Sequence, residues 1–462
     1  MQQRRRVAQC LADAFLCGGT EPSELIGRGS AALGDPVPWL GPLATRIGSA
    51  FGAQWPLESV ALTRLILADP GFRRAWSEPG PKPPIRRWFL PASTMGEPVP
   101  PLAACALPPL ASPGALAEWL GLSSNELDWL ADPWGSERRA AVGPLRHYVY
   151  RWIPKRRGGR RLLEAPKPRL RSVQRQILRG ILDEVLPHPA AHGFRRGRSC
   201  LSHAQSHCGR VLVLRMDLSN FFTQVPARRV HALFTSLGYP PTVARCLTGL
   251  CTNRVPARVL RNPLGERPEL DWKQRQALQH PHLPQGAPSS PALANLALFR
   301  FDLRLERAAA ALGARYTRYA DDMAFSGGAD FARRIAAFHR LICRIGLEEG
   351  FPVETRKTRA MRQGGRQQLT GILVNHHPNL RRRDYDRLKA ILHNCLKLGP
   401  AGQNRDGHRD FRAHLRGKIA HLERLNPTRG RKLLALFERI EWGEFASQTA
   451  GNQRQFCAPV DR

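Results

Sequence analysis

Residues 315–327, RYTRYADDMAFSG, place two adjacent aspartates, Asp321 and Asp322, inside an apolar and β-prone stretch. Neighbouring acids repel one another and burial opposes their ionisation, so they persist mostly where a cation offsets their charge. Successive side chains of a strand point to opposite faces, and only a tight turn brings both acids to one site. The stretch therefore predicts a β-hairpin with Asp321 and Asp322 at its tip.

A third acid, Asp217, ends the apolar run VLVLRM at residues 211–216, which is a costly place for an unpaired charge. Beside the hairpin, the three carboxylates would form an oxygen site suited to Mg²⁺. Two such ions about 3.5–4 Å apart stabilise the attacking and leaving oxygens in nucleotidyl transfer. The alternative is that Asp217 caps the following helix while Asp321 and Asp322 pair with nearby arginines.

The charge balance points to a polyanionic partner. The 462 residues include 71 Lys and Arg against 37 Asp and Glu, a formal net charge of +34. This excess favours nucleic acid as the partner that relieves the self-repulsion, although biased codon usage is an alternative source of part of the arginine. The hydrophobic fraction of 42% is typical of a folded protein and excludes wholesale disorder.

Cysteine usage and hydropathy bear on the compartment. The ten cysteines include no Cys-x-x-Cys pair and no zinc-finger spacing, which favours a reducing cytoplasm. No run approaches the ~18–20 apolar residues of a membrane span. The basic start MQQRRRVAQCLADAFLCGG has its apolar stretch interrupted by Gln9 and Asp13, so we expect an amphipathic helix and no signal peptide. The expectation is a cytoplasmic protein without a membrane partner.

The N-terminal part changes character twice. Residues 1–77 have helical spacing of apolar residues, and residues 78–112 are rich in proline, as in an extended linker. Trp88, Phe89 and Leu90 are candidates for docking this linker on the body of the protein.

Regular structure then resumes. Residues 115–132 predict two short helices, the second capped by Ser123 or Ser124. They form either a DNA-reading helix-turn-helix or, as we favour in the absence of a basic recognition helix, a packing element. Strands and helices alternate from residue 148, a polar insertion occupies residues 255–282, and the chain is mainly helical and basic after residue 375.

The motifs as a set resemble reverse transcriptases, and specifically the retron type that makes branched RNA-linked DNA in bacteria. The resemblance covers roughly residues 113–442, and its blocks follow the order of that family. The blocks are RWIPKRRGGRRLLEAPKPRLRSVQRQIL (151–178), HGFRRGRS (192–199), MDLSNFF (216–222), LPQGAPSSPALANL (283–296), YADDMAFSG (319–327), GFPVETRKTR (350–359), QQLTGILVN (367–375) and LRGKIAHLERLNPTRGRKLL (415–434).

The resemblance implies an α/β (α+β) right-hand polymerase with an antiparallel palm sheet. It places the fingers and palm at 113–375 and a helical thumb at 376–445. A helical N-terminal extension (1–77), a Pro-rich linker (78–112) and a polar tail (446–462) complete the expected organisation.

The resemblance also assigns the metal site. Asp217 and Asp321 would be the principal ligands of two Mg²⁺ ions, with Asp322 in support and the carbonyl of Leu218 completing the shell. Phe222, five residues after Asp217, matches the steric gate that excludes a ribose 2′-OH, the alternative being an ordinary core residue.

Other matched positions concern the nucleotide. Gln285 would touch the nucleotide or the template pair, and Gly286 would permit close backbone approach. Lys155 and Arg161 on the two arms of a hairpin would clamp the triphosphate. Lys357 matches a lysine near the leaving pyrophosphate and would be a general acid, the alternative being a solvated surface charge.

Two departures from the retron pattern concern the RNA. Retron chains usually read Asn-Ala-x-x-His where this chain has His203-Ala204-Gln205-Ser206-His207, and Val-Thr-Gly where it has Leu369-Thr370-Gly371. We expect RNA contacts from Thr370 and an RNA-contact or structural role for His203 and His207. A metal site of these histidines with Cys200 and Cys208 is conceivable, although it fits no standard zinc pattern.

The expected function is RNA-directed DNA synthesis from a structured non-coding RNA that is both template and primer, with deoxynucleotides as substrates and an RNA–DNA hybrid as product. The resemblance further implies priming from the 2′-OH of a guanosine, and anti-phage defence with an effector protein. The alternatives are another bacterial defence or group II intron-like reverse transcriptase, and a non-catalytic RNA-binding scaffold.

Overall fold

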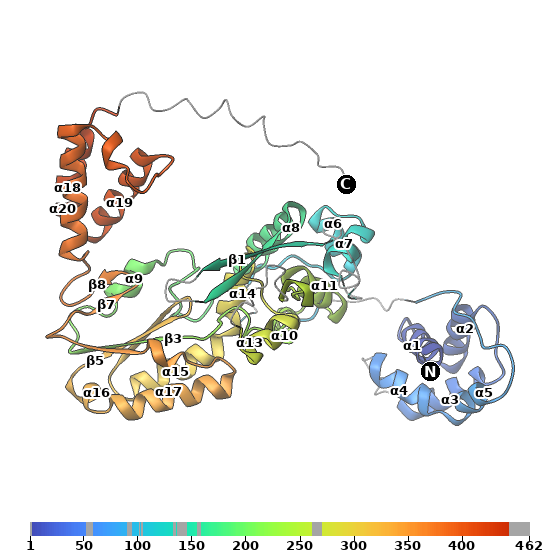
Figure 1. Cartoon of the computed structure of the whole chain (residues 1–462). Helices are drawn as coiled ribbons and strands as arrows, with labels where there is room; N and C mark the ends of the chain where they lie inside the picture. Colours follow the sequence, from blue (N-terminus) through green and yellow to red (C-terminus); the bar gives the residue numbers. More distant parts are fainter. Residues whose placement is uncertain are drawn as a thin grey trace. The chain divides into compact units, whose positions relative to one another are not determined.

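The computed structural model describes residues 2–51, 59–89, 95–100, 102, 105–132, 135, 146–154, 159–260 and 270–442. The chain divides into two compact units (Figure 1), one made of Met1–Glu97 and Pro109–Leu116, the other of Pro98–Pro108 and Ala117–Arg462. Among the described helices, none is both long enough and apolar enough to cross a membrane.

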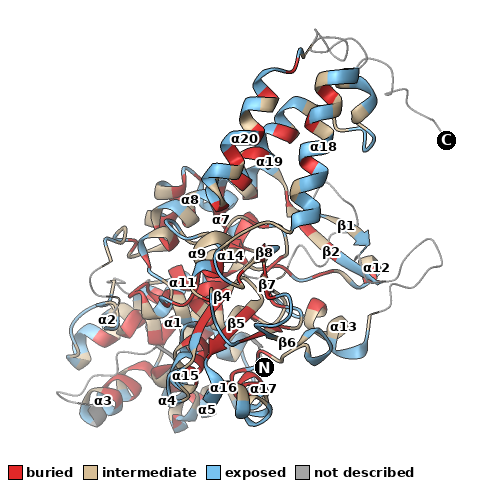
Figure 2. Ribbon diagram, turned by 90° about the vertical axis from the view of Figure 1, so that its left-hand side faces the viewer, coloured by how far each residue is buried: buried red, intermediate tan, exposed pale blue. Residues whose placement is uncertain are grey.

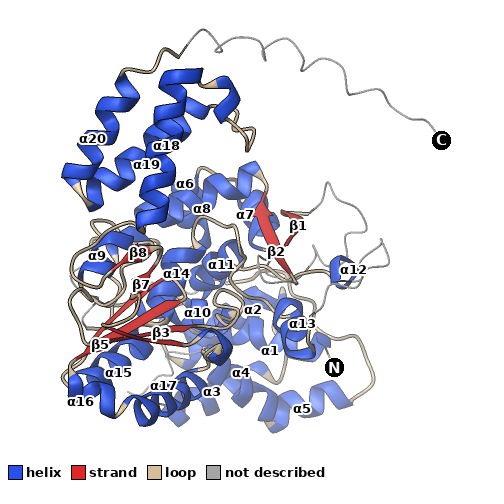
Figure 3. Ribbon diagram, turned by 60° about the vertical axis from the view of Figure 1, so that its left-hand side comes forward, coloured by secondary structure: helices blue, strands red, loops and turns tan. Residues whose placement is uncertain are grey.

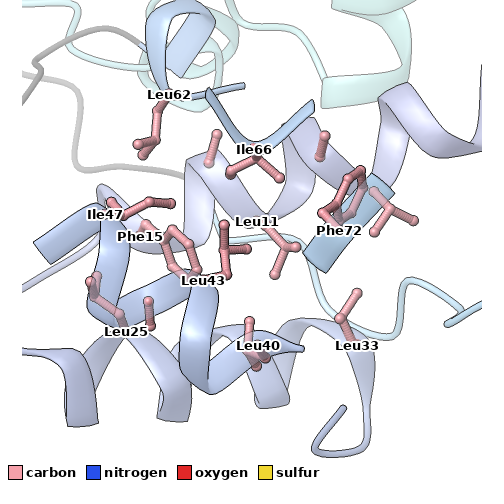
Figure 4. Packing of buried hydrophobic residues seen from close by; sticks show 14 residues of the cluster. Leu11, Phe15, Leu25, Leu33, Leu40, Leu43, Ile47, Leu62, Ile66 and Phe72 are labelled. Atoms are coloured by element: carbon pink, nitrogen blue, oxygen red, sulfur yellow. The ribbon is translucent and has the colours of Figure 1, made fainter. Parts of the chain in front are cut away.

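The first unit is helical. Its helices are α1 (Gln2–Phe15), α2 (Pro22–Leu33), α3 (Leu40–Phe51), α4 (Ser59–Ala68) and α5 (Pro70–Ser77). Leu11 and Phe15 of α1 pack against Leu25, Leu43 and Phe72 in a common core (Figure 4). The predicted amphipathic first helix is confirmed.

The start of the Pro-rich segment lies on this unit. The main-chain N–H groups of Arg86 and Arg87 donate to Ala32 O at 2.8 and 3.1 Å. Trp88 Nε1 donates to Asp13 Oδ2 at 2.9 Å, and Phe89 packs on a small buried cluster of the same helices. Trp88 and Phe89 therefore dock on the N-terminal helices of their own unit, where the prediction had placed them on the body of the protein. Leu90 lies outside the described residues.

The two short helices of the next segment are α6 (Pro113–Leu120) and α7 (Ser124–Ala131). Ser123 is the N-cap of α7 and forms a capping box with Glu126, as predicted. A Cβ at Gly249 would collide with the main chain of Ala131, because α7 packs so closely against helix α11 (Pro241–Cys251). This close packing supports the role of a packing element.

A long hairpin follows. Strand β1 (Tyr148–Pro154) pairs antiparallel with β2 (Arg160–Pro166), and Pro154 lies opposite Arg160. Helix α8 (Pro168–Gly180) and the 3₁₀ turn Leu182–Glu184 come next.

The centre of the second unit is an antiparallel sheet of strand order β4-β5-β3-β6. Figure 3 shows two of its strands, β3 and β5. Its strands are β3 (Leu212–Asp217), β4 (Arg315–Tyr319), β5 (Asp322–Gly327) and β6 (Arg359–Arg362). The mixed helix-and-sheet class and the antiparallel sheet are as predicted.

The side-chain period of two gives the sheet two different faces. On one face, Phe325 packs on Phe338 of α17 (Ile335–Glu349) and Tyr316 reaches α15 (Phe299–Ala310). The other face carries Asp217 and Asp322, and α9 (Cys200–Gln205) and the short pair β7 (Gln368–Leu369) and β8 (Ile372–Leu373) contribute to the core on this side. Strands β3 and β5 and the middle of β4 are buried (Figure 2), whereas the edge strand β6 is mostly exposed.

Further helices complete this unit. They are α10 (Ala227–Ser236), α12 (Ala257–Leu260), α13 (Trp272–Gln279), α14 (Ser290–Ala297) and α16 (Ala329–Arg333). Two of them, α12 and α13, pack with the β1–β2 hairpin. The polar insertion predicted at 255–282 thus contains two short helices, because Asp271 caps α13 through its side chain and Leu278 buries against the hairpin.

The C-terminal helices form a bundle with its own core (Figure 1, orange to red). They are α18 (Arg382–Leu398), α19 (Phe411–Leu425) and α20 (Pro427–Glu438), as the sequence predicted after residue 375. Leu425 joins this bundle to the core beneath β7 and β8.

Candidate active site

The end of the central sheet brings the three predicted acids together. Asp217 is the last residue of β3 and pairs with Asp322, the first residue of β5, while Asp321 lies in the turn before it. Leu218 N donates to Asp321 O at 2.9 Å, and Glu354 N donates to Asp217 O at 2.8 Å. The predicted hairpin, with two acids at its tip and the third beside it, is confirmed.

Burial and repulsion act on these carboxyl groups. Burial raises the pKa of Asp321 to about 6, and the charges of Asp217 and Asp322 add to the rise. Burial also raises the pKa of Asp322, against the lowering effect of Arg215. Carboxylates that repel one another in a poorly solvated place favour a bound cation, and their hard oxygens suit Mg²⁺.

Two basic side chains engage the acids. Lys357 forms an ion pair with Asp217. Arg215 donates to Asp322 through Nε at 2.9 Å and through Nη2 at 2.6 and 2.8 Å. Pairing with an arginine, the alternative to a metal site, is therefore realised for Asp322. Among the described residues, no three His, Cys, Asp or Glu side chains form a group arranged to hold a metal ion.

The turn that carries Asp321 has a strained backbone. Ala320 has φ +56°, a left-handed conformation that is unfavourable for a residue with a Cβ. Gly193 lies so close that a Cβ added to it would be 2.5 Å from Ala320 N. Asn295 Nδ2 holds this glycine by donating to Gly193 O at 2.8 Å. Glycine is required at position 193 because two main chains meet there.

A buried ion pair supports the same turn. Arg318 and Asp302 are both 0% exposed, and Arg318 Nε and Nη2 donate to the carboxylate at 2.8 and 2.6 Å. Tyr316 Oη donates to Asp302 Oδ1 at 2.7 Å. Arg318 Nη1 donates to Asn295 Oδ1 and to Ala320 O, both at 3.0 Å. The pair thus ties α14 and α15 to the turn that carries Asp321.

Phe222 lies five residues after Asp217 and is partly buried. Its ring centroid is 5.1 Å from that of Phe221 and 6.3 Å from that of Phe194. Phe221 is buried core, as expected, whereas Phe194 is 48% exposed and has φ +56°. Phe222 therefore has one neighbour in the core and one at the surface.

The predicted nucleotide turn packs on the β1–β2 hairpin. Glu164 N donates to Gln285 O at 2.9 Å. Gly286 has φ +135°, and a Cβ there would lie 2.8 Å from Glu164 O. The main chain of Gly286 thus lies close to β2, and the side chain of Gln285 is partly exposed. The approach of Gly286 to a nucleotide stays a prediction.

A second buried ion pair lies beneath this turn. His282 Nε2 is 3.0 Å from Glu164 Oε1, and both side chains are 1% exposed. Asn253 Nδ2 donates to Glu164 Oε2 at 2.6 Å. Burial, the largest single effect, lowers the pKa of His282, but the charge of Glu164, its hydrogen bond and the hydrogen bond to His280 O together raise the pKa overall. The pair connects the hairpin to the segment that leads into Gln285.

Of the two residues predicted to bind the triphosphate, the structure describes only Arg161. Arg161 is exposed on β2, opposite Ile153 of β1. Lys155 lies outside the described residues.

His203 and His207 are fully buried. His207 Nδ1 is 2.7 Å from Ser326 Oγ, and Thr317 Oγ1 lies 2.7 Å from His207 Nε2 and 2.6 Å from His203 Nδ1. The prediction that these side chains contact RNA is wrong, because neither ring reaches the surface. Their role is structural, which was the alternative: they fix α9 and the turn that follows it to the sheet through Thr317 and Ser326.

Burial sets the charge of these histidines. It lowers the pKa of His203 to about 3, and His192 and Arg215 lower it further. The pKa of His207 is also far below its ordinary value, mainly through burial. Both rings are therefore neutral at pH 7.

Thr370 lies in the turn between β7 and β8 with φ +45°. Its hydroxyl oxygen is buried and has no hydrogen-bond partner in the described part of the chain. Its contact with RNA stays a prediction.

Several residues of this site were not singled out from the sequence. Arg215 precedes Asp217 by two, so the strand period alone puts both on one face. Phe194 lies within HGFRRGRS, and no local pattern predicts its approach to Phe222. The pairs Arg318–Asp302 and Glu164–His282 join residues 16 and 118 positions apart, which only the fold brings together.

The chain is similar in sequence to known reverse transcriptases. A family model described as reverse transcriptase (RNA-dependent DNA polymerase) matches residues 153–381, a range that contains the three acids and Phe222. The chain is similar to the Retron Mx65 reverse transcriptase of Myxococcus xanthus, with 40% identity over 295 residues, 63% of this chain and 64% of that protein. The match thus spans just under two thirds of that relative's length.

Two further relatives show the same likeness. The Retron Mx162 reverse transcriptase of Myxococcus xanthus is 36% identical over 357 residues, 73% of this chain and 69% of the relative. The Retron Ec86 reverse transcriptase of Escherichia coli is 27% identical over 282 residues, 61% of this chain and 77% of the relative.

Proposed function

The chain belongs to the retron-type reverse transcriptases, a family of RNA-directed DNA polymerases, and from this premise we propose that it copies a structured non-coding RNA into RNA-linked single-stranded DNA. The observation that carries the proposal is the meeting of Asp217, Asp321 and Asp322 at one end of the sheet. The proposed reaction is attack of a primer hydroxyl on the α-phosphate of a deoxynucleotide, with pyrophosphate leaving.

Asp217 and Asp321 would hold two Mg²⁺ ions, with the carbonyl of Leu218 and with Asp322 in support. The residues fit such ions because their oxygens are hard and because their mutual repulsion, seen in the raised pKa of Asp321, is relieved by a divalent cation. Bound Mg²⁺ supplies charge stabilisation of the attacking and leaving oxygens. Arg215 holds Asp322 in place by its bidentate contact.

The residues around the acids would select and orient the nucleotide. The Phe222 ring, partly buried and five residues after Asp217, would stand against the ribose and exclude a 2′-OH. The turn of Gln285 and Gly286 would touch the nucleotide or the template pair, held in place by β2. Arg161, with Lys155, would bind the triphosphate through charge-assisted hydrogen bonds.

Lys357 would protonate the leaving pyrophosphate. Its ammonium group lies against Asp217, one of the carboxylates at which the phosphoryl group reacts in this proposal. An ammonium group in that position supplies a proton and a positive charge near the departing oxygens.

In this proposal the molecule has the parts of a right-hand polymerase. Residues 113–375 form the fingers and palm, residues 376–445 the thumb, and residues 446–462 a polar tail. Residues 1–77 and the linker 78–112 form an extension that would dock an effector protein in anti-phage defence. Priming would start from the 2′-OH of a guanosine in the non-coding RNA, and the product is an RNA–DNA hybrid.

The test is primer extension by the full chain with Mg²⁺ and dNTPs on a 40-nucleotide RNA annealed to a DNA primer. Asp321→Asn should lower synthesis by more than about 10³-fold, since a metal site contributes several kcal/mol to the transition state. Asp330→Asn is the matched control, because this aspartate is exposed on α16 and outside the site. It should retain wild-type activity.

A second arm uses RNA transcribed from the DNA upstream of the gene, without an added primer. DNA that stays covalently attached to RNA supports retron-type priming. If the wild-type chain extends neither substrate, or if Asp321→Asn equals wild type, the proposed enzyme is refuted.

A further inference from the structure

A cavity of about 460 Å³ lies at the outer edge of the central sheet, away from the three acids. Strand β4 is the terminal strand of that sheet. Its outer edge is paired at Arg318, whose N–H donates to Ala190 O and whose carbonyl accepts from His192 N, both at 2.7 Å. The cavity is lined by Arg315, Tyr316 and Thr317 of the same strand, N-terminal to that pairing.

Three arginines from separate segments line this cavity: Arg198, Arg210 and Arg315. All three are exposed, and none of them forms an ion pair within the described ranges. The acidic residue in the lining is Glu306, which is 3.6 Å from His188 Nε2. The cavity therefore has an excess of positive charge.

The buried groups around the cavity respond to this charge. His192, in the lining, is held by a 2.9 Å contact between its Nδ1 and Ser202 Oγ. Burial lowers its pKa to about 4, and the charges of Arg198 and Arg195 lower it further. Arg315 and Arg210 likewise contribute to the low pKa of His207, behind burial and the neighbouring histidines. The charges of these arginines thus act on the buried groups beside the cavity.

Arginines that line one cavity suit phosphate, which guanidinium groups bind by paired charge-assisted hydrogen bonds. The volume lies within the range of about 300–1,000 Å³ that is usual for small-molecule sites, so a phosphate with its attached sugar has room. The site is separate from the proposed catalytic centre, because Arg315 and Tyr319 lie at opposite ends of β4, about 13 Å apart at 3.3 Å per residue.

We propose that the cavity of Arg198, Arg210 and Arg315 binds phosphate groups of the RNA outside the active site. This proposal rests on the proposed function and extends it by naming where the RNA backbone is held. Free phosphate or a free nucleotide has the same chemistry and is the other source to be distinguished. RNA is the source we favour, because the net charge of +34 calls for a polyanion and because a nucleic-acid backbone presents successive phosphates.

The first measurement is equilibrium binding of a fluorescein-labelled 40-nucleotide hairpin RNA between 50 and 300 mM NaCl. The triple variant Arg198→Gln, Arg210→Gln, Arg315→Gln should lower the slope of log K against log salt by about 2, at ~0.7–0.9 for each RNA phosphate that the variant no longer neutralises. The charge-matched control is the triple variant Arg334→Gln, Arg340→Gln, Arg344→Gln. These arginines are exposed and lie at the start of α17 and along it, so this variant should keep the wild-type slope. Equal thermal unfolding of both variants shows that folding is intact.

The second measurement is calorimetric titration of wild type and the cavity variant with inorganic phosphate and with AMP. A lowered RNA slope with no uptake of either small anion supports RNA as the source. An unchanged slope in the cavity variant overturns the proposal, whether or not free phosphate binds. Primer extension at saturating substrate should be equal in the two variants, and a loss confined to the cavity variant would contradict a site outside the active centre. The RNA-binding measurement tests the cavity even if the wild-type chain makes no DNA, so the two proposals can be refuted separately.

Discussion

Replacing His203 by asparagine should make the second unit less sensitive to acid. The change removes one of the buried, neutral histidines between α9 and the sheet and leaves His207 in place. An asparagine side chain retains a group that can hydrogen-bond Thr317 Oγ1, which now lies 2.6 Å from His203 Nδ1.

The magnitude follows from the two states of the ring. The pKa of His203 is lowered to about 3 in the folded chain, whereas an unfolded histidine has a pKa of about 6.5. Between these values only the unfolded state takes up the proton, so stability is full above pH ~6.5 and is lost as the pH falls. For one such group the free energy of unfolding decreases by about 2 kcal/mol from pH 7 to pH 5.

Asparagine is also smaller than histidine. The roughly 40 Å³ that it leaves costs about 1 kcal/mol if the site does not collapse. His203→Asn should therefore be less stable than wild type at pH 7 and more stable at pH 5, with equal stability near pH 6.

Native-state hydrogen exchange of β3 peptides at pH 7, 6 and 5 measures this, because β3 belongs to the unit that contains His203. His376→Asn is the control, since His376 is exposed and its loss should leave the pH dependence of wild type unchanged. If His203→Asn and wild type lose stability in parallel from pH 7 to pH 5, the ring is not a buried neutral group and the reasoning is refuted.

Other changes test the remaining contacts. Arg318→Met leaves Asp302 buried without its partner and should cost about 3–5 kcal/mol in urea unfolding; an unfolding midpoint equal to wild type would contradict the role of the pair. The double variant Arg318→Met, Asp302→Leu should regain much of that stability. It should regain little DNA synthesis, because Ala320 O still lacks the hydrogen bond from Arg318. Full recovery of kcat would show that the turn does not depend on Arg318. The raised pKa of His282 means that the stability from its pair with Glu164 is present at low pH and is lost as the pH rises through that pKa. Glu164→Gln should abolish this loss of stability, which hydrogen exchange of β2 measures. A loss that persists in the variant would count against the pair. Phe222→Ala should raise the use of ribonucleotides relative to deoxynucleotides by about 10–200-fold, as steric discrimination of ~1–3 kcal/mol implies, whereas Phe194→Ala should leave the ratio of kcat/KM unchanged.

The sequence by itself determined the local parts and the chemistry of the site. The apolar run before Asp217 and the β-prone stretch around Asp321 and Asp322 predict a strand and a hairpin from side-chain period and turn geometry alone. The N-cap at Ser123 and the helices after residue 375 follow from equally local rules. The order of motifs supplied the family, which the comparisons showed independently.

Only the tertiary structure decided which charges are paired and which side chains are buried. Arg318 and Asp302 meet because β4 packs on α15, and nothing in the spacing of the two residues predicts a fully buried pair. His203 and His207 have polar rings at helical spacing, which suits RNA contact as well as packing, and the sheet beneath α9 decides for packing. Spacing along the chain reports which face a residue shares with its neighbours, whereas burial depends on what the rest of the chain places against that face.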